Sequence, residues 1–322
     1  MSFLVKYLAE GNNADNILLW SQQDVENGNK VVLVCSKKYA EQHINAQIPV
    51  FDSLEDIKNS QHNISAICCE NEAAVFAVDC ASRLKAVECR VFTANDGIFS
   101  SDPDVDDYAV RLERIDYDEV IELCNSGYTN VDMDMVEKAK KLGVIIRVLS
   151  YNSTDGQGTI VKEVMSFGSG TVKGIIKEPD ICIVSLRGIP DVAGISYHIF
   201  QAVSDAGVNV DMISLPASDY GRQDISFTIH KEDKVATRRV LKDKQAELGY
   251  SDVVIKDDVA KISVVGSGVK TNKGVAARVF GILYENNINL RFISTSEIKI
   301  NVFVDKADAD IAVQKIHQYF IQ

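Results

Sequence analysis

The sequence predicts a protein of the α/β class, in which one α/β domain is followed by two copies of a smaller α+β module. The first observation is that strand-like and helix-like runs alternate through residue 149. That alternation is typical of helices packed on a largely parallel sheet. The second observation is an internal repeat, since the glycine-started run at 194–200 returns at 274–280. Such self-similarity indicates that one structural unit occurs twice.

Composition and charge exclude some classes of partner. The chain has 322 residues, of which 46% are hydrophobic and 25% charged, as in ordinary soluble proteins with a buried core. The net charge of −12 disfavours nucleic acid and anionic membranes, because both require clustered Lys and Arg. No apolar run reaches the roughly 18 residues that span a bilayer, and the N-terminus lacks a cleavable signal pattern. We therefore expect a cytoplasmic protein with no nucleic-acid or membrane partner.

The seven cysteines are expected to be reduced thiols and not metal ligands. Cys35, Cys89 and Cys182 lie in strand-like apolar runs, where a buried thiol is the ordinary state. Cys68 and Cys69 are adjacent, which is not a metal-binding spacing, and no histidine lies close to them in sequence. The sequence thus predicts no metal site.

Five strands and five helices are expected in the N-terminal domain, residues 1–155. The strands are predicted at residues 3–8, 30–35, 64–68, 88–93 and 144–149. The helices are predicted at residues 13–25, 54–59, 72–84, 117–125 and 134–142. Asn95, Asp96 and Gly97 form a turn signal, and Gly143 is a good stop for the last helix. Residues 156–179 are interpreted as a linker that includes a strand at 171–177.

Each repeat reads strand, glycine-started helix, strand, strand, helix, which is the ferredoxin-like split βαβ plan. The same offset pairs Asn209 with Asn289 and Ser214 with Ser294. The pattern divides this half into a first module at 180–258 and a second at 259–322. The first module has a closing strand at 252–255, whereas no such strand follows the last helix of the second. The strand at 171–177 is therefore a candidate to complete the second module, which would interlace the two.

Several short blocks resemble the aspartate kinase family. The loop 188–194 resembles the ligand loop of an ACT module. Blocks that resemble the second ACT module of aspartate kinases lie at residues 265–269, 274–277 and 293–300. Blocks that resemble the last third of the catalytic domain lie at residues 96–103, 117–119 and 147–150. The resemblance covers residues 64–322, and residues 1–63 match weakly. It implies a shortened amino-acid-kinase-like α/β domain followed by two ferredoxin-like (ACT) α+β modules.

The resemblance implies an amino-acid effector site at the start of the first module's helix. A helix N-terminus offers unpaired N–H groups and a positive dipole end to a carboxylate, and Gly194 permits close approach of the backbone. Asp191 or Asp211 could hold the effector's ammonium group, although each could equally be a solvated loop residue or a cap. By resemblance the effector is lysine or threonine, and the protein is a homodimer. The candidate effector contacts are Asp191, Val192, Ala193, Gly194, Ile195, Asn209, Asp211, Asp224, Ser294, Thr295, Ser296 and Glu297.

The first block that holds nucleotide phosphates in the family is altered here. The family's first strand ends in Lys-Tyr/Phe-Gly-Gly-Thr-Ser, where the glycines let backbone N–H groups face phosphate. In this sequence Leu8, Ala9 and Glu10 follow the retained Lys6 and Tyr7. A carboxylate near the phosphates would repel them. Lys6 is a remnant of a catalytic group, or alternatively an ordinary surface or sheet-end lysine.

Later blocks are altered in the same direction. The family's Gly-Gly-Ser-Asp-Thr-Thr-Ala block aligns with residues 68–74, which introduce Glu70 and Glu72. Asp104 stands where a basic residue is usual, and the stretch between residues 36 and 64 is too short for the family's aspartate-binding segment. Phosphoryl transfer depends on positioning and charge neutralisation, which these changes weaken. The remnant catalytic candidates are Lys6, Asp96, Gly97 and Asp102.

The sequence leaves three functional hypotheses. The first is an aspartokinase-like regulatory protein that binds lysine or threonine through its ACT pair and has an inactive kinase half. The second is an active aspartate kinase that phosphorylates L-aspartate with ATP in lysine, threonine and methionine biosynthesis. The third is a regulatory subunit that joins a complete aspartate kinase. No cofactor is expected under the first hypothesis, and Mg-ATP is expected only if the kinase half is active.

Overall fold

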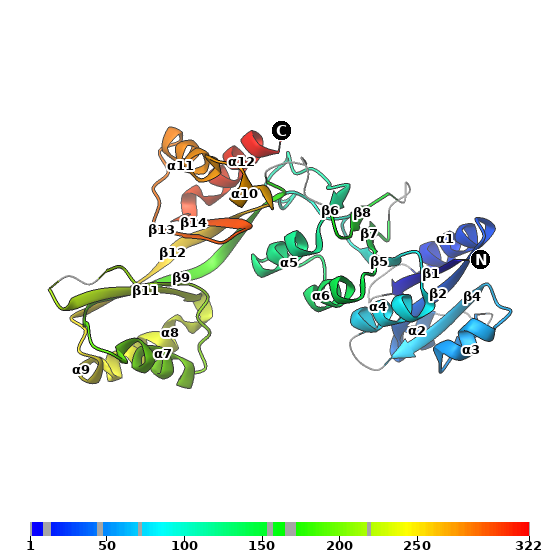
Figure 1. The fold of residues 1–322 in the computed structure, drawn as a ribbon, viewed down its shortest axis with the longest axis horizontal. Coiled ribbons are helices and arrows are strands. Elements are labelled where there is room, and N and C mark those ends of the chain that lie inside the picture. Colours follow the sequence, from blue (N-terminus) through cyan, green and yellow to red (C-terminus); the bar gives the residue numbers. More distant parts are fainter. Residues whose placement is uncertain are drawn as a thin grey trace.

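The protein consists of two halves, each built on its own sheet (Figure 1). The computed structural model describes residues 2–8, 14–43, 48–69, 73–152, 157–164, 172–217 and 220–321. The N-terminal half lies at one end of an elongated molecule and the two modules lie at the other, with helix α5 (Tyr117–Asn125) between them. Among the described helices, none is both long and apolar enough to cross a bilayer.

The N-terminal half has an eight-stranded sheet in the order β3-β4-β2-β1-β5-β7-β8-β6. All neighbouring strands are parallel except β7 and β8. The strands are β1 (Ser2–Leu8), β2 (Asn29–Ser36), β3 (Val50–Phe51), β4 (Ile64–Cys69), β5 (Cys89–Thr93), β6 (Arg114–Ile115), β7 (Ile146–Ser150) and β8 (Thr159–Val161). The other helices of this half are α1 (Ala14–Glu26), α2 (Lys37–His43), α3 (Leu54–Asn59), α4 (Ala73–Leu84) and α6 (Met133–Leu142).

Helices cover both faces of this sheet, as the side chains of β2 demonstrate. Val32 and Val34 pack into a core that includes buried residues of α4, α5 and α6. Leu33 and Cys35 point the other way, into a core with residues of α1 and α2. Because both faces are buried, β2 is a continuous apolar run and does not alternate with polar residues. Helix α6 ends at Gly143, whose positive φ of 66° lets its N–H bond back to the last turn.

Every strand and helix predicted for this half overlaps an observed element, and four short elements were not predicted. These are α2, β3, β6 and β8. Strand β8 corrects the interpretation of residues 156–179 as a linker, because residues 159–161 pair with β7 and β6 inside the sheet. Thr159 fixes this strand from within: its hydroxyl donates to the carbonyl of Leu112 at 2.6 Å and accepts from the N–H of Ile98 at 2.8 Å.

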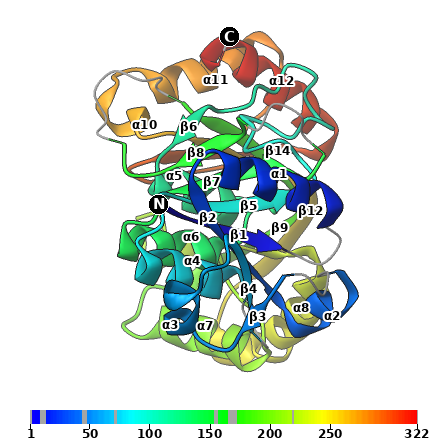
Figure 2. The same cartoon turned by 90° about the vertical axis from the view of Figure 1, so that its right-hand side faces the viewer.

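The two modules share one six-stranded antiparallel sheet in the order β10-β11-β9-β12-β14-β13. Its strands are β9 (Gly174–Pro190), β10 (Ile213–Ser214), β11 (Arg222–His230), β12 (Asp252–Val265), β13 (Phe292–Thr295) and β14 (Lys299–Asp305). The helices are α7 (Ile195–Asp205), α8 (Lys234–Asp243), α9 (Gln245–Leu248), α10 (Gly268–Thr271), α11 (Val275–Glu285) and α12 (Ala309–Phe320). Figure 2 faces the N-terminal half and shows α11 and α12 towards one end of the molecule and α7 and α8 towards the other.

Two long strands, β9 and β12, run through both modules. Residues 183–187 of β9 pair with 252–256 of β12 in the first module, and residues 174–178 pair with 261–265 in the second. The register shifts between the two stretches, around Val259. Each module keeps its own apolar core, one beneath α7 and α8 and one beneath α11 and α12. The start of β9 thus lies beside the opening strand of the second module, so the modules interlace.

The halves meet through apolar packing, in which Ile176 and Val265 join the core beside α5, and through polar contacts. The carbonyl of Ser100 accepts a hydrogen bond of 2.7 Å from the N–H of Ile175, next to the first residue of β9. Glu119 on α5 accepts one of 2.9 Å from the N–H of Ser267, which precedes α10. Lys299 on β14 lies 2.9 Å from Glu122 on α5. Helix α5 and the loop before it therefore form the N-terminal half's contact with the second module.

Candidate effector site and remnant phosphate site

The helix α7 begins without a side-chain cap. Its N-cap is Gly194, with a φ of 90°, which has no side chain to accept a hydrogen bond from the first turn, and the N–H of Ile195 donates to the carbonyl of Val192 at 3.3 Å. A Cβ placed on Gly194 would meet nothing within 4 Å, so the N-terminus of the helix faces open space. Gly274 repeats this geometry before α11, with a φ of 93° and the same open surroundings. Both helices expose N–H groups that a carboxylate can accept.

The loop before α7 is braced from strand β11. The N–H of Gly188 donates to Asp224 at 2.8 Å, and the N–H of Asp191 donates to the carbonyl of Gly221 at 3.0 Å. Arg222 donates to the carbonyl of Gly188 and, at 3.3 Å, to that of Gly249. The backbone of the loop is therefore fixed before any ligand arrives, and Asp224 is a loop brace.

The two aspartates considered for the ammonium group have different surroundings. Asp191 is exposed, and within the described part of the chain its carboxylate has neither an ion-pair nor a hydrogen-bond partner. Asp211 is bound 3.0 Å from Lys261, a buried lysine that also lies 2.6 Å from Glu178. Asp211 is therefore already engaged by a cation of its own chain. Of the remaining loop residues, Val192 and Ala193 are exposed, whereas Ile195 is buried in the first module's core.

The second group of candidate contacts lies elsewhere. Ser294 and Thr295 end strand β13, and Ser296 follows in the turn. The N–H of Ser296 donates to the backbone carbonyl of Lys299 at 2.9 Å. Strand β13 is one edge of the six-stranded sheet, and β10, beside Asn209 and Asp211, is the opposite edge. Ser294, Thr295, Ser296 and Glu297 thus lie in the second module, far around the sheet from the loop before α7. A single chain does not bring the two groups together.

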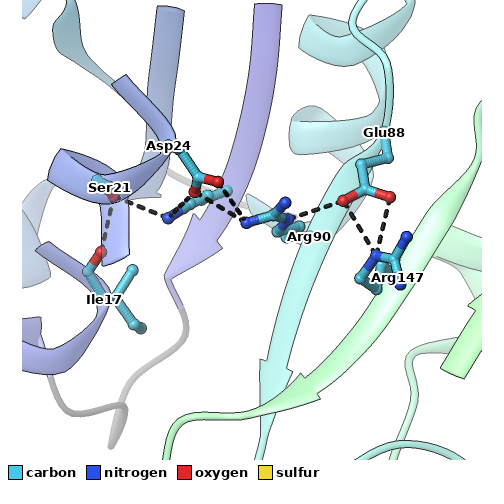
Figure 3. Close-up of polar contacts among 7 residues, drawn as sticks. Ile17, Ser21, Asp24, Glu88, Arg90 and Arg147 are labelled. Carbon is cyan, nitrogen blue, oxygen red and sulfur yellow. Dashed lines mark hydrogen bonds and ion pairs between the residues drawn. The ribbon is translucent and has the colours of Figure 1, made fainter. Parts of the chain in front are cut away.

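Lys6, the candidate remnant of a phosphate site, lies in a set of internal ion pairs (Figure 3). Lys6 lies on β1 with a fully buried side chain, so it is not a surface lysine. Its ammonium lies 2.7 Å from Asp24 and 3.0 Å from the hydroxyl of Ser21, both on α1. Burial lowers the pKa of Lys6 to about 8, and the bond and charge of Asp24 oppose that shift. The positive charge of Lys6 is therefore paired with a carboxylate of its own chain.

A chain of alternating charges continues from this pair across the sheet. Arg90 on β5 binds Asp24 with contacts of 2.8 and 3.0 Å, and Nε of the same arginine lies 2.7 Å from Glu88. Arg147 on β7 also binds Glu88, at 2.9 Å. Each cation in Figure 3 thus has a carboxylate partner. The arrangement joins α1, β1, β5 and β7.

The other remnant residues have structural partners. Asp96 pairs with Arg111 and accepts a 3.2 Å hydrogen bond from the N–H of Ser150. A Cβ on Gly97, which has a φ of 108°, would lie 2.5 Å from the hydroxyl of Thr159. Asp102 accepts from the N–H of Asp104 at 3.0 Å in a turn. The substitutions at Ala9, Glu10, Glu70 and Glu72 lie outside the described residues.

Three features of the structure gave no signal in the sequence. The partners of Lys6 follow it on the next helix and look like ordinary polar residues of an amphipathic helix. A buried contact of Ser100, Asp106 and His317 joins residues more than 200 positions apart. The thiols of Cys35 and Cys68 lie 4.0 Å apart on neighbouring strands. Over the described residues, no group of three or more His, Cys, Asp or Glu side chains has the arrangement of a metal site.

Known proteins match both halves of the chain. The Amino acid kinase family matches residues 4–150, and the ACT domain matches residues 181–245 and 262–320. The aspartate kinase of Pseudomonas fluorescens (strain SBW25) is 35% identical over 242 residues, which cover 74% of this chain and 58% of that protein. The aspartokinase of Helicobacter pylori (strain ATCC 700392 / 26695) is 36% identical over 250 residues, which cover 76% and 61%. The chain therefore spans about three fifths of the length of these relatives.

Solved structures share the fold. The aspartate kinase of Clostridium acetobutylicum superposes with a TM-score of 0.81 at 16% identity, covering 99% of this chain and all of that one. Aspartokinase III of E. coli, in complex with aspartate and ADP, superposes with a TM-score of 0.72 at 15% identity over the whole of both chains. An amino-acid-kinase half followed by interlaced ACT modules, together with the sequence relatives, leads to one conclusion: the chain belongs to the aspartate kinase family.

Proposed function

We propose that this chain is a regulatory member of the aspartate kinase family, which binds lysine or threonine through its ACT pair and does not transfer phosphate. The observation that carries the proposal is the buried pair of Lys6 and Asp24. In the family's motif this lysine precedes glycines that face phosphate. Here its charge is satisfied by a carboxylate on α1, and a nucleotide would have to displace that partner.

The cost of displacement argues against nucleotide binding. Breaking a buried ion pair by removing one partner leaves an uncompensated charge, which costs about 3–5 kcal/mol. Asp24 is also held by Arg90, so its carboxylate could not simply rotate away. The altered phosphate blocks and the short stretch between residues 36 and 64 act in the same direction. The names of the relatives favour the alternative, an active kinase that phosphorylates L-aspartate with Mg-ATP.

The effector is proposed to bind at the start of α7. Its carboxylate would accept hydrogen bonds from the open helix N-terminus beside Gly194, and Asp191 would hold the ammonium group. Asp211 and Asp224 are assigned a supporting role, since Lys261 and the N–H of Gly188 engage them. Lysine and threonine differ in the end of their side chains, so the end group that the site prefers would distinguish them. Both amino acids are included in the test below.

A homodimer would bring the two groups of candidate contacts together. The edge strands β10 and β13 carry exposed isoleucines at equivalent positions of the repeat, Ile213 (56% exposed) and Ile293 (43%). Unpaired sheet edges with exposed apolar side chains favour pairing with another chain. We propose that β10 of one chain lies beside β13 of its partner. Thr295 and Ser296 of the partner subunit would then close the site at Asp191.

The proposal also includes the cellular location of the protein and a partner protein. We place the chain in the cytoplasm, in keeping with its seven free thiols. A complete aspartate kinase encoded separately remains the partner under the third hypothesis. Effector binding would act on such a partner through its differential affinity for two quaternary states.

A thermal-shift panel tests the proposal, with lysine, threonine, methionine, aspartate and Mg-ATP added separately. A ligand at about 100 times its dissociation constant adds roughly 2.7 kcal/mol to stability. We expect a raised midpoint with lysine or threonine and none with Mg-ATP. The variants Asp191→Asn and Gly194→Val should abolish the amino-acid shift, whereas Gly274→Val, the matched glycine of the second module, should retain it. A shift with Mg-ATP that aspartate deepens would favour the active kinase instead.

A further inference from the structure

Three side chains form a fully buried contact between the two halves of the molecule. The hydroxyl of Ser100 lies 2.7 Å from Nε2 of His317, and Nδ1 of His317 lies 3.1 Å from Asp106. All three residues are inaccessible to solvent. Ser100 and Asp106 belong to the loop that follows the remnant turn at Asp96, and His317 is on α12, the last helix of the second module.

The surrounding hydrogen bonds accommodate a neutral His317. Ser100 Oγ accepts from the N–H of Val110 at 3.0 Å, so its own proton is free to be donated to Nε2 of His317. His317 then carries its proton on Nδ1, facing Asp106. Asp106 accepts from the N–H of Tyr108 at 3.1 Å through its other oxygen. Over the described residues, neither Nδ1 of His317 nor the facing oxygen of Asp106 has a hydrogen-bond partner, so their 3.1 Å contact is a close approach without hydrogen-bond geometry.

A serine, a histidine and an aspartate in contact resemble the catalytic triad of acyl-transfer enzymes, but here the three side chains cannot be catalytic. Ser100 is fully buried, so no substrate reaches its hydroxyl. The contact instead joins two elements. Gln314 of α12 adds a hydrogen bond of 3.1 Å to the carbonyl of Val105, between the two ends of the contact. The loop is thus attached to α12 by two hydrogen bonds and by the close approach of Asp106 to His317, and to β9 at the N–H of Ile175.

Few charged groups face His317. Asp106, from the loop, is the group whose charge acts on it, and it favours the protonated form. Two further charges on elements packed against α12 have partners of their own: Lys177 of β9 lies 2.6 Å from Asp310, and Arg278 of α11 lies over the ring of Tyr319. Burial outweighs Asp106 and lowers the pKa of His317 below its ordinary value of 6.5.

We propose that Ser100, Asp106 and His317 form an acid-released latch between the kinase-like half and the second ACT module. In the docked state His317 stays neutral, whereas in an undocked state it would be solvated and titrate normally. Below pH 6.5 the undocked state therefore binds more protons, and acid favours undocking. The docking equilibrium constant falls by at most about tenfold between pH 7.5 and pH 5.5, the limit for a docked histidine that stays fully neutral. The inference does not depend on which effector the ACT pair binds.

Hydrogen exchange of the full chain, followed by mass spectrometry at pH 7.5 and pH 5.5, tests the latch. After correction for the intrinsic pH dependence of exchange, we expect peptides over 99–110 and 309–320 to lose protection together at pH 5.5. Peptides over β2 and β11 should not change. In His317→Gln the loss of exchange protection in these peptides should be independent of pH. His198→Gln, which changes an exposed histidine on α7, should behave as the wild type.

A second measurement keeps the inference testable if His317→Gln does not fold. An NMR titration of the wild-type imidazoles should show one histidine that remains neutral below pH 6.5, and Ser100→Ala should move its midpoint upwards. Wild-type protection that is equal at both pH values would overturn the latch, as would the same pH response in His317→Gln. Neither result would bear on effector binding, which the thermal-shift panel measures separately.

Discussion

The ammonium of Lys6 lies 2.7 Å from the carboxylate of Asp24, inside the N-terminal half. Because the lysine is fully buried, Asp24→Ala should leave its charge without compensation and cost about 3–5 kcal/mol of unfolding free energy, despite the remaining bond to Ser21. Urea denaturation measures this. Glu55→Ala is the matched control, because Glu55 pairs with Lys58 in an exposed contact of 3.6 Å and should cost less than about 1 kcal/mol. Equal costs for the two variants would show that Lys6 does not rely on Asp24.

Two glycines of the modules should respond in opposite directions to alanine. Gly281 lies inside α11, and an added Cβ would meet only the end of Arg278 at 3.9 Å. Gly281→Ala should therefore stabilise the protein by about 0.5–1 kcal/mol, since alanine loses less entropy on folding. Gly194→Ala has equal space but a φ of 90°, and strain should cost about 1–2 kcal/mol. Thermal unfolding of the two variants checks both signs.

Charged residues at the sheet edges should separate the proposed dimer. Ile213→Lys and Ile293→Lys each place a cation on an exposed edge strand, where it opposes pairing with another chain. Sedimentation velocity should show each variant shifted from dimer to monomer. Ile311→Lys, at a half-exposed position on α12, is the control and should sediment as the wild type. If only the control dissociated, the dimer would have to form through another face.

Lys261 predicts a specific alkaline response. Burial alone would lower its pKa, but the bonds to Glu178 and Asp211 outweigh burial and raise it. A raised folded-state pKa means that the stabilisation is fully present below the ordinary lysine value of 10.5 and is lost as pH rises through the folded value. Lys261→Arg, which stays charged, should lose less stability than the wild type above pH 10.5. Urea midpoints measured across that range give the difference, and parallel curves would contradict it.

Sequence patterns located the elements whose signal is local. Apolar runs and the stop at Gly143 placed the long strands and helices of the N-terminal half, and the repeat identified the two modules. The start of β9 lies beside the opening strand of the second module, which pairs with β14 on its other side, and the missing fourth strand of that module already indicated this in the sequence. Two-residue strands such as β3 and β6 have no periodicity to detect, and β8 lay hidden in a polar stretch.

The partners of the site residues were harder to predict because they depend on tertiary contacts. Nothing around Asp24 distinguishes it from a solvated helix residue until α1 packs against β1 beside Lys6. His317 likewise meets Ser100 only after the chain has folded through both modules. Asp211 was a reasonable candidate for an ammonium ligand, since only the structure places Lys261 beside it. The glycine at the start of α7 could be identified from the sequence, whereas the bonds that Asp224 and Gly221 make to the loop before it appear only in the structure.

The shared strands β9 and β12 have a consequence for the ancestry of the molecule. Each contributes one stretch to the first module and another to the second, so a cut between the modules would sever both strands. Neither module could be lost, exchanged or transferred to another gene without removing part of its neighbour's sheet. The two modules should therefore be inherited together as one unit, even where the kinase-like half beside them is shortened.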